Sequence, residues 1–271
     1  MNRIANYHTH IYLCKHATGT IEEYVQKAIS LGYKVLGISD HGPVSDDLTT
    51  RWHSRRMSMA ESITYLEELK ALKTKYSDQI TLLGAFEIEY SNTYLSRLLE
   101  MRDSVDYLVL GQHQIEIDGD FKSIYFNQTE KSLKIYADTI IEALETGLFK
   151  ILAHPEIFLY TYPSFDSVCL EISKRIIESA IKNNVILEIN ANGIRDSLNK
   201  TGQLFREDLY KYPNLEFWRL VSKYQKDFDL KVVINDDSHS VYSFHDKFTE
   251  EAYKFADRLG IKITNLIDFN N

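Results

Sequence analysis

The sequence predicts an α/β fold in which seven parallel strands close into one barrel. Short apolar runs alternate seven times with stretches of helical apolar spacing, the pattern of β-α units and a parallel sheet. Every predicted strand is followed by polar, potentially reactive side chains. An open doubly wound sheet gathers its ligands at one switch point, whereas a barrel arranges all its strand ends around one axis. Seven polar strand ends therefore favour the barrel, with its active site at the C-terminal ends of the strands.

The elements follow in strict β-then-α order. The predicted strands cover 3–8, 34–39, 80–86, 106–111, 150–153, 185–189 and 231–234. Capping boxes at Thr20 and Ser58 begin the first two helices, which end near Gly32 and Tyr76. Later helices are predicted at 93–103, 130–146, 165–182, 215–228 and 247–259, and the tail 261–269 is predicted as a short edge segment.

Three connections are predicted as long loops, which in a compact α/β unit usually have a function. They are the polar segment 42–57, the segment 115–128 with its turn at 118–120, and the segment after the sixth strand, which contains Arg195 and Arg206.

Composition narrows the class of protein. The 271 residues, with a net charge of −8, suit one domain covering 1–271. The acidic balance argues against a protein that grips nucleic acid, and the absence of long apolar runs argues against a membrane protein. Two distant cysteines and no apolar leader predict a cytoplasmic location. The oligomeric state is not predicted.

Histidine is concentrated at the predicted strand ends. Seven of the nine histidines lie there, together with Glu87 and Asp237. Without cations, such crowding would leave many polar groups unpaired, and imidazole with carboxylate suits zinc, iron or manganese. Nine ligands are enough for three divalent ions. The histidines concerned are His8, His10, His16, His41, His113, His154 and His239. Cys14 lies between two of them, but a thiolate would be unusual in this set.

The charge of such a site indicates its substrate. Three divalent ions, two carboxylates and a bridging hydroxide leave roughly three positive charges. A phosphate monoester dianion fits this charge.

The ordered motifs resemble those of the polymerase-and-histidinol-phosphatase (PHP) superfamily. The matching segments are His8-Thr9-His10, Asp40-His41, Glu87, His113, His154-Pro155 and Asp237-Ser238-His239. The segments 39–43 and 190–195 are similar to the stand-alone histidinol-phosphate phosphatases of histidine biosynthesis. The resemblance implies a distorted (β/α)7 barrel and a trinuclear site.

The resemblance also implies how the ligands are shared. The first metal would be held by His8, His10, Glu87 and Asp237. The second would be held by Glu87 as a bridge, with His113 and His154. The third would be held by His16, His41 and His239. Glu89 follows on the same strand face as Glu87 and stays an alternative.

The implied activity is metal-dependent hydrolysis of L-histidinol phosphate to L-histidinol and phosphate, with attack by a hydroxide that bridges the first two metals. Asp237 or His239 is expected to assist as a general acid. Arg195 is the expected phosphate-binding side chain, and Arg206 a second substrate contact. Arg51, Arg55 and Arg56 are expected to be solvated. A carboxylate from 42–57 or 115–128 is expected to bind the substrate amino group.

Two other functions are compatible with this sequence. The same site could act on nucleotides or other small phosphate esters, as other PHP members do. The chain could also be a non-catalytic, metal-binding regulatory protein. The complete ligand set argues against the second alternative.

Overall fold

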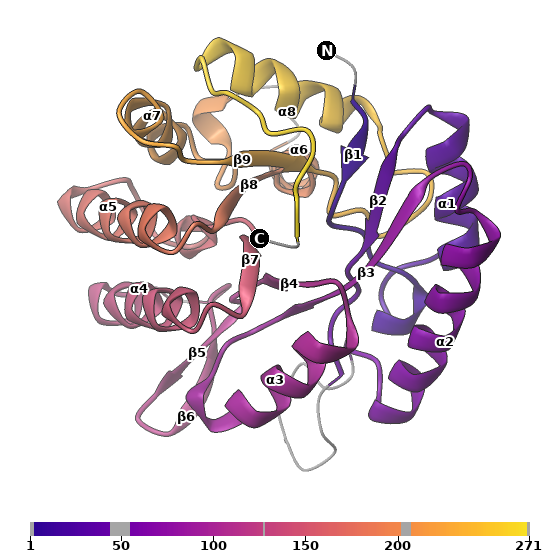
Figure 1. The fold of residues 1–271 in the computed structure, drawn as a ribbon. Coiled ribbons are helices and arrows are strands. Elements are labelled where there is room, and N and C mark those ends of the chain that lie inside the picture. Colours follow the sequence, from indigo (N-terminus) through magenta and orange to yellow (C-terminus); the bar gives the residue numbers. More distant parts are fainter. Residues whose placement is uncertain (1–2, 44–54, 127, 202–206, 270–271) are drawn as a thin grey trace.

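A barrel of seven parallel strands forms the centre of the molecule, with helices around the outside (Figure 1). The computed structural model describes residues 3–43, 55–126, 128–201 and 207–269. Within them the sheet order is β1-β2-β3-β4-β7-β8-β9, so each strand lies beside its predecessor in this series. The predicted fold class is confirmed. The strands are β1 (Ala5–Asn6), β2 (Val35–Ile38), β3 (Thr81–Ile88), β4 (Tyr107–Leu110), β7 (Phe149–Leu152), β8 (Ile186–Asn190) and β9 (Val232–Asn235).

The barrel closes just beyond the ends of its first and last strands. Thr9 and Ser238 form a parallel bridge there. The Asp237 backbone N–H donates to the His8 carbonyl at 3.0 Å, and that of His10 donates to Ser238 at 2.9 Å. The backbone that closes the barrel therefore also carries four of the predicted ligands: His8, His10, Asp237 and His239.

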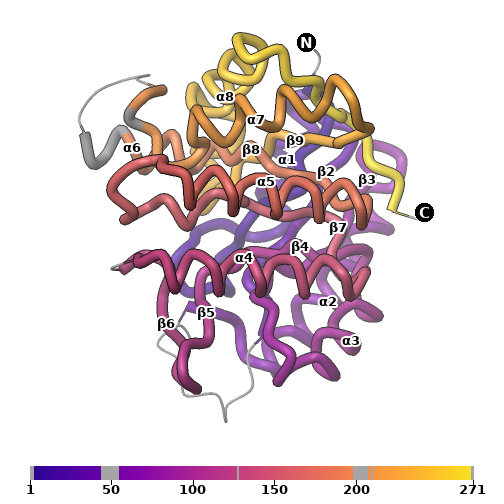
Figure 2. The backbone as a smooth tube through the Cα atoms, turned by 90° about the vertical axis from the view of Figure 1, so that its left-hand side faces the viewer, coloured from indigo at the N-terminus to yellow at the C-terminus, as the bar shows by residue number. Residues whose placement is uncertain are grey.

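The helices cover the outside of the barrel, α4 packing against α5 and α5 against α7 (Figure 2). Both predicted capping boxes, at Thr20 and Ser58, are present. The helices are α1 (Ile21–Ser30), α2 (Met59–Lys75), α3 (Leu95–Ser104), α4 (Glu130–Glu145), α5 (Ser167–Lys182), α6 (Ala191–Thr201), α7 (Leu215–Tyr224) and α8 (Lys247–Arg258). Short 3-10 turns cover Tyr12–Cys14, Asn92–Tyr94, Ile157–Leu159 and Glu207–Leu209.

Two of the predicted loops contain regular structure. Residues 115–128 include most of an antiparallel hairpin, β5 (Gln114–Ile117) and β6 (Asp120–Ser123). Its turn residues Asp118 and Gly119 both have positive φ, which an Asp-Gly pair adopts easily. The segment after β8 begins directly with α6, because the Asn190 side chain accepts a hydrogen bond from the Gly193 N–H at 3.2 Å. Arg195 therefore lies on a helix.

The tail packs over the N-terminal end of the barrel and, in its described part to residue 269, forms no strand. The Phe269 ring stacks on Tyr107 with centroids 4.3 Å apart, and the Ile267 N–H donates to the Tyr7 hydroxyl at 3.0 Å. Figure 1 shows the tail running to the middle of the barrel. The opposite end, where the strands terminate, is left for the predicted site.

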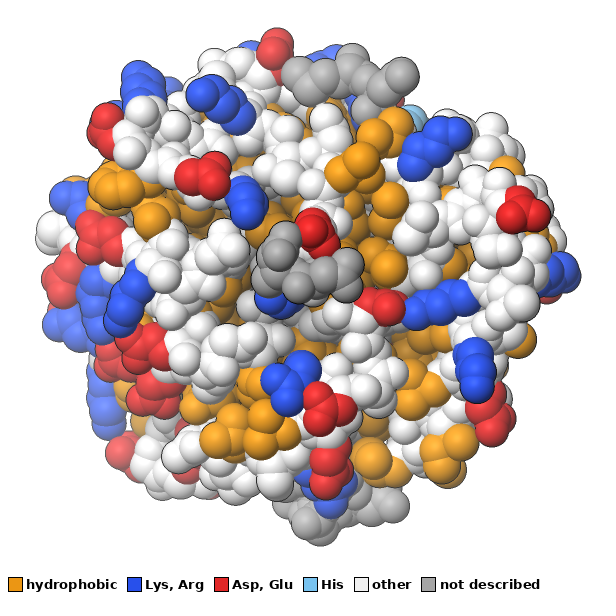
Figure 3. All heavy atoms as spheres, viewed as in Figure 1, with side chains coloured by type: hydrophobic (Ala, Val, Ile, Leu, Met, Phe, Trp, Pro, Cys, Tyr) orange, Lys and Arg blue, Asp and Glu red, His pale blue; other side chains and the backbone are white. Residues whose placement is uncertain are grey.

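Basic and acidic side chains are interspersed on the face shown in Figure 3. Hydrophobic side chains lie between them, and the predicted histidine cluster is not seen from this side. Among the described helices, none has the length and apolar character needed to cross a bilayer.

Candidate metal centre

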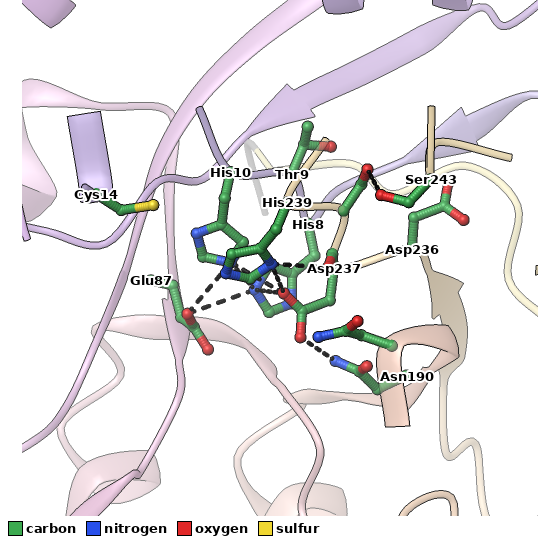
Figure 4. A network of polar contacts seen from close by, with 12 residues as sticks. His8, Thr9, His10, Cys14, Glu87, Asn190, Asp236, Asp237, His239 and Ser243 are labelled. Carbon is green, nitrogen blue, oxygen red and sulfur yellow. Dashed lines mark hydrogen bonds and ion pairs between the residues drawn. The ribbon is translucent and has the colours of Figure 1, made fainter. Parts of the chain in front are cut away.

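All nine predicted ligands meet at the C-terminal end of the barrel. The backbone places eight of them at or just after a strand, and His16 follows the 3-10 turn Tyr12–Cys14. Figure 4 shows His8, His10, Glu87, Asp237 and His239 pointing toward one another. His154 and Asp237 have positive φ, at 32° and 46°. Such a conformation is strained for residues other than glycine and is typical of functional sites.

The first predicted ligand group is tightly clustered. The Nε2 atoms of His8 and His10 are 3.1 Å apart, and His10 Nε2 is 3.0 Å from Asp237 Oδ1. Glu87 Oε2 lies 3.5 Å from each of the two Nε2 atoms. These four side chains are almost fully buried.

The second group uses the other oxygen of the same carboxylate. Glu87 Oε1 lies 3.1 Å from His154 Nε2 and 3.6 Å from His113 Nε2. Glu87 therefore presents one oxygen to each group, which is the arrangement needed of a bridging ligand. His41 Nδ1 also lies 3.0 Å from Oε2.

The third group lies toward the mouth of the site. His16 Nε2 and His239 Nε2 are 3.1 Å apart, and ligand atoms of His16, His41 and His239 lie within 4.8 Å of one another. The His16 and His41 rings stack with centroids 5.2 Å apart. His16 is the exposed member, so this group is the one nearest to solvent.

Hydrogen bonds away from the centre define which imidazole nitrogen faces inward. His8 Nδ1 donates to Glu188 Oε2 at 2.8 Å, and His16 Nδ1 donates to the Cys14 carbonyl at 2.8 Å. His239 Nδ1 donates to the Asp237 carbonyl at 3.1 Å. Each partner fixes the tautomer with the proton on Nδ1, so Nε2 carries a lone pair. Two inward lone pairs only 3.1 Å apart, as in His16 and His239, are unfavourable unless a cation binds both, and a divalent metal suits these donors.

The electrostatics of the first group also favour a cation. Burial alone would lower the pKa of His10, but hydrogen bonds to Asp237 and Asp40 raise it to about 9. Burial would raise the pKa of Glu87, but nearby histidines, His8 first, hold it well below the usual range. The same balance holds the pKa of Asp237 well below its usual range. Both carboxylates are thus kept ionised.

The third group behaves differently. Burial lowers the pKa of His41 well below its usual value. Burial, reinforced by the charge of His10, lowers that of His239 to about 3. These imidazoles are neutral at physiological pH, which is the form that binds metals.

A polar layer beneath the first group was not anticipated from the sequence. Glu188 is fully buried and accepts hydrogen bonds from His8, from Asn235 Nδ2 at 2.8 Å and from Asn190 Nδ2 at 2.7 Å. Asn190 also donates to Asp237 Oδ2 at 3.0 Å. One carboxylate therefore orients two ligands, one directly and one through Asn190. The run Glu188-Ile189-Asn190 at a strand end was the available signal.

Glu89, the alternative to Glu87, contacts the outer nitrogen of His113. Its Oε1 accepts from His113 Nδ1 at 3.1 Å, and both its oxygens accept from Arg56. Glu87 faces Nε2 of the same ring. This geometry favours Glu87 as the ligand and Glu89 as its supporting partner.

A cavity of about 550 Å³ opens over these groups. One wall is aromatic: Tyr125 packs edge-on against Tyr160 with centroids 4.8 Å apart, and Tyr160 lies 6.2 Å from Tyr212. Asp196 also lines this cavity, and burial raises its pKa. The cavity can therefore take a phosphate at the ligand groups and a planar organic group beside them.

Three further residues were considered as site residues from the sequence: Arg195, Arg206 and Cys14. Arg195 lines the cavity, whereas Arg206 lies outside the described residues. Cys14 is near His10 and His239, but its thiol donates to the Ile11 carbonyl and burial raises its pKa, so it is a poor ligand.

The expected amino-binding carboxylate is not found among the described residues of either predicted loop. Glu116, Asp118 and Asp120 lie on the hairpin and do not line the cavity. Asp46 and Asp47 lie outside the described residues. Among the described residues, two carboxylates outside the preferred ligand set line the cavity: Glu89, which pairs with Arg56, and Asp196 on α6.

Comparisons with known proteins place this geometry in a family. The model of the PHP domain matches residues 6–192. A Deinococcus radiodurans protein, provisionally named a histidinol-phosphatase, is 27% identical over 164 residues, which are 57% of this chain and 61% of that protein. The match thus spans less than two thirds of that relative.

Two solved structures share the fold. A provisionally assigned histidinol phosphatase of Listeria monocytogenes superimposes with a TM-score of 0.73 at 22% identity, covering 91% of this chain and 99% of that one. The histidinol phosphate phosphatase of Lactococcus lactis, solved with zinc, L-histidinol and phosphate, gives a TM-score of 0.68 at 17% identity, covering 96% and 95%. At these identities the likeness extends to the fold alone.

Proposed function

The chain belongs to the PHP domain family, and from that premise we propose that it is a metal-dependent phosphomonoesterase that hydrolyses L-histidinol phosphate to L-histidinol and phosphate. The observation that carries the proposal is the double role of Glu87, whose two oxygens face two separate ligand groups. Adjacent divalent ions that share a carboxylate are the usual device for hydrolysing phosphate esters.

Three divalent ions are proposed, held as the ligand groups divide. His8, His10, Glu87 and Asp237 would hold the first. Glu87, His113 and His154 would hold the second, and His16, His41 and His239 the third. Zinc, iron and manganese all suit these donors. When bound, such ions lower the pKa of water and polarise the phosphoryl group.

The chain itself orients these ligands and supplies the rest of the site. Glu188 keeps the His8 proton on Nδ1, and the closing backbone holds Asp237 opposite His10. The low pKa of Asp237 favours its role as a ligand over that of a proton donor. The pKa of His239 is lowered as well, to about 3, so this imidazole is also better suited to hold a metal than to donate a proton to the leaving oxygen.

The cavity wall supports an amino-alcohol substrate that carries a planar ring. Tyr125, Tyr160 and Tyr212 offer aromatic faces beside His113 and His154, where an imidazole could pack. Asp196 would bind the substrate ammonium group. Arg195, the phosphate contact expected from the sequence, lines the same cavity. A matching enzyme would serve histidine biosynthesis.

The test is phosphate release by the metal-loaded protein from a panel of esters. Histidinol phosphate should exceed nucleoside 3′-monophosphates and bis-p-nitrophenyl phosphate in kcat/KM by roughly 100-fold, because only it can use both the aromatic wall and Asp196. His113→Asn and Asp237→Asn should lose turnover together with metal. Preference for a nucleotide would refute the substrate. No hydrolysis of any ester by a fully metallated sample would favour the non-catalytic alternative.

A further inference from the structure

Arg56 lies in the wall of the metal cavity, although the sequence suggested a solvated side chain. It is only 5% exposed, and it lines the cavity together with Glu87 and His113. The expectation was wrong because a carboxylate 33 residues further along the chain draws the guanidinium inward. A buried arginine in a cavity lined by metal-ligand candidates needs a chemical reason.

One reason for the burial of Arg56 is its ion pair with Glu89. Arg56 Nη2 donates to both carboxylate oxygens, and Glu89 Oε1 also accepts from His113 Nδ1 at 3.1 Å. Glu89 therefore fixes the guanidinium one carboxylate away from a proposed metal ligand. The Arg56–Glu89 pair is neutral overall, so Arg56 adds directed N–H donors to the cavity rather than net charge.

The second terminal nitrogen of the Arg56 guanidinium, Nη1, lacks a hydrogen-bond acceptor in the described part of the chain. Arg56 Nη1 is buried and has no hydrogen-bond partner among the residues that the structure describes. Leaving a charged N–H donor buried without an acceptor is costly, so the geometry points to an acceptor other than the residues that the structure describes. An anion bound at the adjacent ligand groups would supply it.

Arg195, the sequence-based candidate for this role, is already occupied. Its Nε and Nη2 donate to Asp246 Oδ2 at 3.2 and 3.0 Å, and Nη2 also donates to the Ser243 carbonyl at 3.1 Å. Its Nη1 donates to Asn192 Oδ1 at 2.8 Å. Four hydrogen bonds leave Arg195 one free N–H at most, so it cannot offer the two parallel donors of a guanidinium fork.

We propose that Arg56 is the guanidinium that binds the phosphoryl oxygens of the substrate, with Glu89 as its positioning residue. The inference rests on the proposed function, which supplies the phosphate. Nη1 donates to an oxygen that the metals do not occupy, and the Glu89 pair prevents the side chain from swinging to solvent. Arg195 then shapes the same wall as a structural residue tied to Asp246.

The experiment measures binding of inorganic phosphate to metal-loaded protein by calorimetry, so that it needs no turnover. Arg56→Met should weaken phosphate binding roughly 10- to 100-fold, the value of a charge-assisted hydrogen bond. Arg56→Lys should fall between, because it keeps the charge without the fork. Arg195→Met should have a smaller effect. Arg175→Met is the charge control and should bind phosphate normally, because this partly exposed arginine of α5 pairs with Asp138 of α4 and does not line the cavity.

Metal content is measured on every sample, because a role limited to supporting His113 would lower metal occupancy. The proposal requires Arg56→Met to keep its metals, and Arg56→Lys gives the same reading should the methionine variant fail to fold. Unchanged phosphate affinity, lost metal, or a larger effect at Arg195 would each overturn it. Arg56-dependent phosphate binding without hydrolysis of any ester would refute the proposed function alone.

Discussion

Gly111→Ala should disable the metal centre although it replaces none of the predicted ligands. Gly111 follows β4, and a Cβ there would lie 2.0 Å from Glu87 Oε1 and 2.5 Å from Glu87 Cδ. Ordinary contact begins near 3.4 Å, so the carboxylate must move by about 1.4 Å, whereas metal–ligand distances tolerate only about 0.2 Å. Glu87 cannot turn aside freely, because its oxygens face His154 at 3.1 Å and His41 at 3.0 Å.

Because Glu87 serves two ligand groups, we expect metal affinity to fall by at least about 100-fold, the upper range for a disturbed supporting residue. Turnover should fall with it. The assay is competitive titration of zinc against a chelator, with circular dichroism to show an intact fold. Gly84→Ala is the matched control on β3: its Cβ meets Leu69 Cδ1 at 2.6 Å, so it should cost roughly 1–3 kcal/mol of stability and leave zinc affinity unchanged. Wild-type zinc affinity in Gly111→Ala would refute the bridging geometry.

Three further outcomes are expected. Glu188→Gln places an amide N–H₂ group against one of the three donors that Glu188 accepts from, His8, Asn190 and Asn235. Zinc affinity, measured by competition with a chelator, should fall roughly 10- to 100-fold. An unchanged affinity would contradict the orienting role of Glu188. Removing the metals should lower the melting temperature, since metal at a hundredfold excess over Kd stabilises by about 2.7 kcal/mol, or roughly 5–10 °C at this size; an apo protein that melts at the holo temperature would argue against metal binding. Burial raises the pKa of Glu156 from 4.5 to about 7, so the folded protein holds this proton more tightly than the unfolded chain. As the pH rises from about 4.5 to about 7, the free energy of unfolding should therefore fall by about 3 kcal/mol in total. Glu156→Gln removes this titration. In urea unfolding, its free energy of unfolding should rise relative to that of the wild type between pH 5 and 8. A difference between the two proteins that does not change with pH would contradict the raised pKa.

The fold and the gathering of the predicted ligands could be anticipated because both depend on local pattern. Apolar runs of strand length fix where strands end, and parallel strands in a barrel bring all those ends together. The sequence thus predicted that His8 and His154 would meet although 146 positions separate them. That their nitrogens bind metal stays a prediction.

The supporting residues could not be anticipated because they depend on contacts across the barrel. Arg56 sits in a loop, and it is buried where it pairs with Glu89, 33 positions further along the chain. Glu188 reads as one more polar residue at a strand end until the structure places it against His8, which follows β1, and Asn235 at the end of β9. The hairpin after β4 was missed because each of its strands has only four residues, the shortest run in which polar–apolar alternation indicates a strand.

The end of β3 carries residues for both parts of the proposed chemistry, metal binding and phosphate binding. Glu87 and Glu89 are two residues apart on β3 and its extension, so their side chains point to the same face, and they face opposite nitrogens of His113. The first carboxylate would bridge metals, and the second would hold the guanidinium that meets the phosphate. The Tyr65 hydroxyl fixes this register by donating to the carbonyls of Ile38 and Ala85, each at 2.8 Å. Any shift of β3 would therefore move the metal bridge and the carboxylate that holds Arg56 together, because both carboxylates lie on this strand and its extension.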